Sequence, residues 1–106
     1  MDLLSKKCIP CERGGPKLEP PRIMDLLPQV PTWNVKDDKL CKTFQFEDFV
    51  AAMHFLNRVA ELAEKEGHHP DFSVHYSRVD FTIFTHAVGG LSENDFILAA
   101  KIDNLA

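Results

Sequence analysis

Three of the five histidines in this 106-residue chain occur in one motif. His68 and His69 are adjacent and are followed by Pro70, and His86 stands further along the chain. Imidazole has an ordinary pKa close to neutral, so it can donate or accept a proton at physiological pH. The motif therefore predicts general acid/base chemistry carried by His68, His69 and His86.

A carboxylate lies close to the histidine pair. Glu64 stands four residues before His68, which on a helix is about one turn, so its carboxylate could accept from the imidazole and orient it. Pro70 favours an extended conformation at His69. We expect Glu64 to support the histidines at the end of a helix.

Metal and nucleophile chemistry are less favoured by the residue spacing. Two adjacent histidines rarely bind the same ion, and no second carboxylate completes a facial triad, so no catalytic metal is predicted. No serine or cysteine lies in a nucleophile-elbow motif. The Cys8-x-x-Cys11 pair is half of a zinc site or a redox pair. A zinc-supported N-terminal arm therefore stays open as an alternative.

The long helix that must position the pair is expected over residues 47–66. Its apolar residues recur at helical spacing and are Phe49, Met53, Leu56, Ala60 and Ala63, with Val59 and Leu62 beside them. Gly67 suits the left-handed position after the helix end. Residues 68–70 then form the loop that leaves the helix.

Two hairpins flank this helix in the predicted order. Residues 32–36 and 40–46 form the first, and residues 72–76 and 79–86 form the second across Ser77 and Arg78. A short helix over residues 22–27 precedes them, and a final helix capped by Ser92 follows. The predicted fold is α+β: a four-stranded antiparallel sheet with helices on one face. Residues 1–20 form an irregular arm rich in Pro, Gly and Cys, and residues 21–106 form one domain.

Composition excludes several classes of protein. The formal net charge of −4 argues against a nucleic-acid-binding face. The apolar runs are too short for a membrane span, and no secretory signal is expected. The three cysteines suit a reducing compartment better than a disulfide framework, so a cytoplasmic location is predicted. With 44% hydrophobic residues, the chain can bury a substantial core.

The spaced residues resemble the signature of the pterin-4a-carbinolamine dehydratases. The matching positions are Glu64, His68, His69, Pro70, Tyr76, His86 and Asp95, and the similarity extends over about residues 22–105, including Trp33 and Glu93 to Phe96. The Cys8-to-Cys11 arm resembles plant-like members, some of them organellar, so a mitochondrial or other organellar location is the alternative.

The resemblance implies an enzyme, a 4a-hydroxytetrahydrobiopterin dehydratase. Such a hydro-lyase eliminates water from 4a-hydroxytetrahydropterin and yields quinonoid dihydropterin for pterin recycling, without a cofactor. His68 and His86 would be general acids for the departing hydroxyl, and His69, supported by Glu64, would bind the pterin. The ligand would be lined by two stretches: His68, His69 and Pro70, and Thr85, His86, Ala87 and Val88.

The resemblance also bears on partners. Members of the family form homodimers or homotetramers, so a homo-oligomer is expected, with a pterin as the small-molecule partner. Some animal members assist the dimerisation of a homeodomain transcription factor, a role not carried over to this chain. A non-enzymatic protein-binding or assembly module on the same fold is the alternative function.

Overall fold

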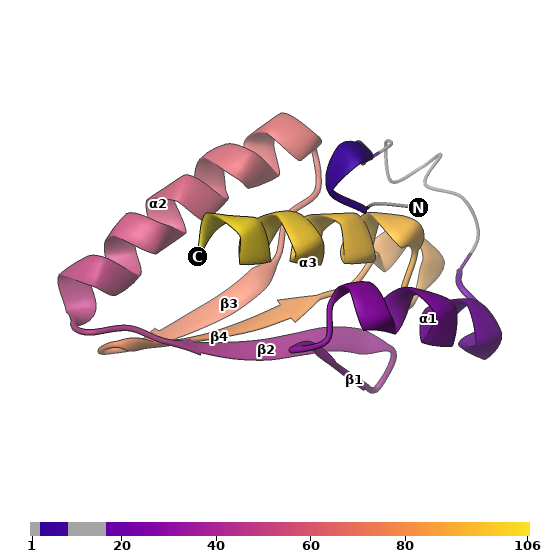
Figure 1. The fold of residues 1–106 in the computed structure, drawn as a ribbon, viewed down its shortest axis with the longest axis horizontal. Helices are drawn as coiled ribbons and strands as arrows, with labels where there is room; N and C mark the ends of the chain where they lie inside the picture. The colour runs from indigo at the N-terminus through magenta and orange to yellow at the C-terminus, as the bar shows by residue number, and fades with distance from the viewer. Residues whose placement is uncertain (1–2, 9–16) are drawn as a thin grey trace.

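The computed structural model describes residues 3–8 and 17–106 (Figure 1). Its elements follow one another as η1 (Leu3–Ser5), α1 (Pro20–Leu26), η3 (Leu27–Gln29), β1 (Asn34–Lys36), β2 (Lys39–Gln45), α2 (Phe49–Glu66), β3 (Asp71–His75), β4 (Arg78–Ile83), η4 (His86–Val88) and α3 (Glu93–Leu105). This order confirms the predicted succession of a short helix, two strands, a helix, two strands and a helix. Within the described ranges, no helix is long and apolar enough to cross a membrane.

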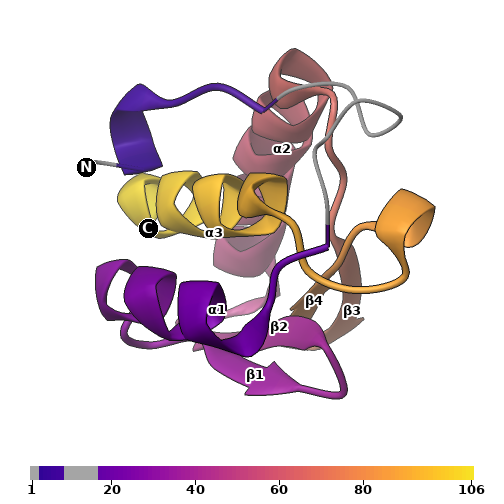
Figure 2. The ribbon, with the colours of Figure 1, turned by 90° about the vertical axis from the view of Figure 1, so that its right-hand side faces the viewer.

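The four strands form one antiparallel sheet in the order β1-β2-β4-β3. Figure 1 shows α2 and α3 lying over the same face of this sheet, and the turned view in Figure 2 shows α1 near β1 and β2. The predicted fold class is confirmed. Because β4 pairs with both β2 and β3, the segment that follows it leaves from the middle of the sheet.

The second hairpin differs from its predicted bounds. Its turn is formed by Tyr76 and Ser77, with Tyr76 in the left-handed region at φ 56°, instead of by Ser77 and Arg78. β4 ends at Ile83, so the prediction of a strand reaching His86 is wrong. The reason is local: Thr85 pairs with Gly90, which turns the chain into a closed loop instead of continuing the strand.

The long helix begins two residues later than predicted. Asp48 is its N-cap, because Asp48 Oδ1 accepts from the backbone N–H of Ala51 at 2.8 Å. The predicted apolar stripe is partly wrong, since Phe49 and Ala60 are exposed. The buried side of α2 is instead formed by Ala52, Phe55, Leu56, Val59, Ala63 and Glu66.

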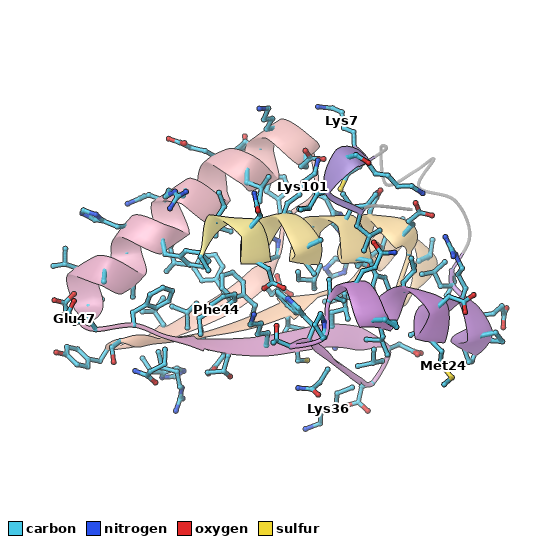
Figure 3. The ribbon with its side chains drawn as sticks, viewed as in Figure 1. Lys7, Met24, Lys36, Phe44, Glu47 and Lys101 are labelled. Atoms are coloured by element: carbon cyan, nitrogen blue, oxygen red, sulfur yellow. The ribbon has the colours of Figure 1, made fainter. Side chains whose placement is uncertain are left out.

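Aromatic side chains fill the space between the sheet and the helices. Val79, Phe81 and Ile83 of β4 are all buried, as their alternation predicts. The Phe81 ring meets that of Phe44 edge-on at 5.5 Å between centroids, and Phe44 lies between the sheet and α3 (Figure 3). This core fixes α2 and α3 relative to the strands.

Residues 3–8 of the predicted arm pack onto the domain. Leu3 and Cys8 are buried in the same hydrophobic cluster as the residues of α3. η1 lies against α3, as Figure 2 shows. The rest of the arm around Cys11 lies outside the described residues, so the zinc hypothesis and the division at residue 20 stay predictions.

Candidate active site

His68 is a buried histidine at the junction of α2 and α3. Only 3% of the His68 surface is accessible to solvent. The Nε2 atom lies 2.6 Å from Oδ1 of Asp95, which is fully buried in the first turn of α3. A carboxylate oxygen accepts, so this contact places a proton on Nε2 of the imidazole. The pair orients His68 firmly.

The second oxygen of Asp95 is also bonded. Oδ2 accepts from the backbone N–H of Ser92 at 2.8 Å and from the hydroxyl of Thr85 at 3.0 Å. The Thr85 and Ser92 hydroxyls lie 2.8 Å apart, and both residues are fully buried. Asp95 therefore joins His68, the start of α3 and the segment after β4 in one buried network. Such a saturated network holds a single geometry.

His86 lies in a loop that this network anchors. The backbone N–H of Thr85 donates to the carbonyl of Gly90 at 2.8 Å, which closes the loop over η4. Gly89, at φ 66°, provides the left-handed turn that ends η4. His86 is exposed, and its ring centroid lies 4.3 Å from that of Phe84. The loop thus presents His86 to solvent while its first residue, Thr85, is fixed beside Asp95.

His69 occupies a different environment from His68. Its Nε2 lies 2.6 Å from Oε2 of Glu64, and both side chains are exposed. Glu64 therefore contacts His69, the pairing that the resemblance implies, whereas His68 contacts Asp95. Gly67, at φ 69°, ends α2 directly before the two histidines. After this turn His68 is buried and His69 is exposed.

A hollow lies beside His69, between the C-terminal half of α2 and the start of β3. Its volume is about 170 Å³, and its lining is mostly apolar: Val59, Ala60, Ala63, Glu64, His69, Pro70 and Phe72. His69 and Glu64 are its polar groups. A small flat ligand with hydrogen-bonding edges suits such a combination of apolar walls and few polar groups.

The structure connects some of the predicted site residues and places others in different environments. His68 and the His86 loop are linked through Asp95 and Thr85. Thr85, predicted to contact substrate, is fully buried, and its hydroxyl is engaged with Asp95 and Ser92. Ala87 is exposed and Val88 half-buried on η4, where both can be reached from outside.

Ser92 is the N-cap of α3, as predicted, but sequence reasoning missed the bonds that Asp95 makes to Ser92, Thr85 and His68. A signal for them existed, because an acidic residue three positions after a serine N-cap is the pattern of a capping box. The remaining histidines lie elsewhere: His54 is exposed on α2, and His75 lies 3.3 Å from the hydroxyl of Ser73. In residues 3–8 and 17–106, no group of three or more His, Cys, Asp or Glu side chains is arranged to hold a metal ion.

The protein is an α+β domain in which a buried imidazole–carboxylate pair lies beside a loop that carries a second histidine. Proteins with such a site are suited to proton transfer. The family model described as pterin 4 alpha carbinolamine dehydratase matches residues 16–105. The chain belongs to this family. The motif residues from Glu64 to Asp95 all lie within the matched range.

Relatives and solved structures agree with this assignment. A protein of Rubrobacter xylanophilus named "Putative pterin-4-alpha-carbinolamine dehydratase" is 44% identical over 98% of each chain. A protein of Methylococcus capsulatus with the same name is 49% identical over 98% of this chain and 93% of its own. The plant-like origin of the arm stays a prediction.

Two solved structures share the fold. One, from Brucella melitensis and described as a transcriptional coactivator/pterin dehydratase, has a TM-score of 0.80 and 33% identity, covering 84% of this chain and 97% of its own. The other is described as a pterin dehydratase-like protein that is a RuBisCO assembly factor in the alpha-carboxysome. It has a TM-score of 0.58 and 31% identity, covering 70% of this chain and 86% of its own.

Proposed function

We propose that this protein is a dehydratase that eliminates water from 4a-hydroxytetrahydropterin and yields quinonoid dihydropterin. One observation carries the proposal: His68 is held by the buried carboxylate of Asp95, and the same carboxylate anchors the loop that bears His86. Expelling a hydroxyl group requires a proton donor next to it, and imidazole is suited to give and regain that proton near neutral pH.

His68 and His86 are the proposed acid/base pair. One protonated imidazole donates to the 4a-hydroxyl, which leaves as water. The substrate also gives up one proton, which a neutral imidazole can accept. The fixed orientation of His68 and the closed loop under His86 support this division, because proton transfer depends on a defined distance between donor and acceptor.

His69 and Glu64 are the proposed pterin-binding groups. Their contact at 2.6 Å leaves the imidazole oriented at the rim of the mostly apolar hollow near Pro70. A pterin ring has apolar faces and a polar edge, which match apolar walls with a few polar groups. His68, Pro70, Ala87 and Val88 are proposed to line the ligand, with Thr85 fixing the loop beneath them.

A rapid-mixing assay of carbinolamine disappearance tests the function. Single changes His68→Ala and His86→Ala are expected to lower kcat by about 10²-fold or more, the usual contribution of a general acid or base. His54→Ala is the matched control, because His54 is an exposed histidine on α2 outside the network. A double variant as fast as wild type would refute the acid/base assignment.

A protein-binding or assembly role is the second candidate function. The observation that favours it is the similarity to a solved structure described as a RuBisCO assembly factor. This function predicts that association with a partner protein survives the combined loss of the His68 and His86 imidazoles. If the wild-type protein lacks dehydratase activity but binds a partner protein, the assembly role replaces the dehydratase proposal.

The assembly and the location belong to the same proposal. A homodimer or homotetramer is proposed, and sedimentation equilibrium of the full chain measures it. A cytoplasmic location is proposed from the odd number of cysteines, with an organellar location as the alternative. Fractionation of the source cells separates the two.

A further inference from the structure

Cys8 contacts the end of α2, which leads into His68, and the first turn of α3, which carries Asp95. Its backbone N–H donates to Oε1 of Glu66 at 2.9 Å, and Glu66 is the last residue of α2. Its thiol lies 3.6 Å from the carbonyl oxygen of Asn94, in the first turn of α3. Glu66 stands two positions before His68, and Asn94 stands directly before Asp95. The arm therefore bridges the two helix ends behind the pair.

Glu66 is the centre of this bridge. The residue is only 8% exposed, and its second oxygen, Oε2, accepts from the Lys101 ammonium of α3 at 2.7 Å. Burial by itself would raise the pKa of the Glu66 carboxyl. The hydrogen bonds from the Cys8 N–H and Lys101, together with the Lys101 and Lys7 charges, outweigh burial and hold that pKa below its ordinary value. Glu66 is thus a charged buried group that joins α2, α3 and the arm.

Other arm residues hold the same two helix ends. Lys6 forms an ion pair with Glu93, the first residue of α3. Lys7 reaches the carbonyl oxygen of Lys65 in the last turn of α2 at 3.5 Å. Figure 3 shows Lys7 at η1 and Lys101 on the side of α3 away from the sheet. The contacts of residues 6–8 converge on the junction where His68 meets Asp95.

We propose that Glu66, bonded to Cys8 of the arm, is a positioning residue for His68. It keeps the end of α2 and the first turn of α3 at the separation that the His68–Asp95 hydrogen bond requires. A single change at Glu66 would free Cys8, Lys101 and the helix end that leads into His68. The catalytic consequence rests on the proposed dehydratase function, whereas the structural claim does not.

Proton NMR of ¹⁵N-histidine-labelled protein tests the structural claim without substrate. The measured quantity is the exchange rate with water of the His68 Nε2 proton that Asp95 accepts. Glu66→Ala is expected to speed this exchange by about 10-fold, because the hydrogen bond opens more often. Glu66→Gln keeps the shape and an acceptor for Cys8, and is expected to recover most of the protection.

A stability-matched control separates positioning from general destabilisation. Val79→Ala removes buried volume from β4, outside the bridge and the network, and should lower Tm while the His68 resonance keeps its wild-type chemical shift. If Glu66→Ala changes the His68 shift and exchange no more than Val79→Ala does, the positioning role is refuted.

The activity assay adds a second readout. Glu66→Ala is expected to lower kcat by about 10-fold with little change in KM, because a displaced proton donor slows chemistry more than binding. Wild-type protein without dehydratase activity would refute the proposed function alone. The NMR comparison would still decide whether Glu66 positions His68.

Discussion

Asp95 is the residue on which the site most depends. It is fully buried and accepts from His68, Ser92 and Thr85. In Asp95→Asn, one of the two side-chain positions becomes an amide donor, so at least one of these donors loses its acceptor. A buried donor without a partner costs free energy, and we expect a loss of about 2–4 kcal/mol in unfolding free energy.

Urea unfolding measures this loss, and the dehydratase assay should show a parallel fall in kcat. Asp71→Asn serves as the control, because Asp71 is exposed at the start of β3. Equal stability of the Asp95→Asn and Asp71→Asn proteins would contradict the role given to the buried network.

Cys8 makes stability sensitive to alkaline pH. Burial, with the nearby Glu66 charge, raises the pKa of the Cys8 thiol to about 12 from 9.0. A raised folded-state pKa means that stability is fully present below pH 9 and is lost as pH rises towards 12. Between pH 9 and 10 the wild type should lose about 1 kcal/mol relative to Cys8→Ala, and the slope approaches about 1.4 kcal/mol per pH unit at higher pH. Parallel urea unfolding curves at pH 8, 9 and 10 make this comparison, and a constant difference between the proteins would contradict it.

Sequence spacing selected the candidate histidines but did not identify all their partners. The i to i+4 rule relates Glu64 to His68, whereas Glu64 contacts His69 in the structure, because the helix ends at Glu66 and Gly67 turns the chain away from helical geometry. Asp95, which contacts His68, belongs to α3 and is distant in sequence. A rule for neighbours along one helix cannot identify a contact made by tertiary packing.

The end of α2 governs how the adjacent histidines diverge. Gly67 adopts φ 69°, and a Cβ built there meets no atom within 4 Å, so only the backbone conformation opposes a larger residue. Gly67→Ala should therefore cost about 1 kcal/mol in unfolding free energy, and Gly67→Asn less, since asparagine tolerates this region better. Urea unfolding of wild type, Gly67→Ala and Gly67→Asn ranks their unfolding free energies. An alanine variant as stable as wild type would contradict the prediction.

Local sequence patterns predicted which helices and strands form better than they predicted the residues at which each one begins and ends. The alternation in β4 correctly predicted its buried face, but the same alternation continued past Ile83 into residues that form the His86 loop. The Thr85–Gly90 pairing that ends the strand leaves no periodic signal. For α2, apolar residues stand on two sides of the helix, and only contact with the sheet decides that Phe55 is buried and Phe49 is not.

In the folded protein, α3 is buried more completely than the pattern of apolar residues in its sequence predicts. All residues from Asn94 to Ala100 are buried, so the helix is covered around its circumference instead of on one stripe. The sheet covers one side, and residues 3–8 with η1 cover part of another (Figure 2). An arm rich in Pro, Gly and Cys carries no periodicity, so its packing on the domain could not be predicted from sequence.

Leu3 and Leu4 provide a matched test of this covering layer. Leu3 is 1% exposed and belongs to the core cluster, whereas Leu4 is 42% exposed. Leu3→Ala should lower the unfolding free energy by about 2–3 kcal/mol, because it removes a buried side chain from above α3. Leu4→Ala should lower it by less than about 1 kcal/mol. The emission of Trp33, the single tryptophan, follows unfolding, since its ring is buried and its Nε1–H donates to Asp103 of α3 at 3.0 Å. Equal losses in the two variants would mean that the arm does not complete the core.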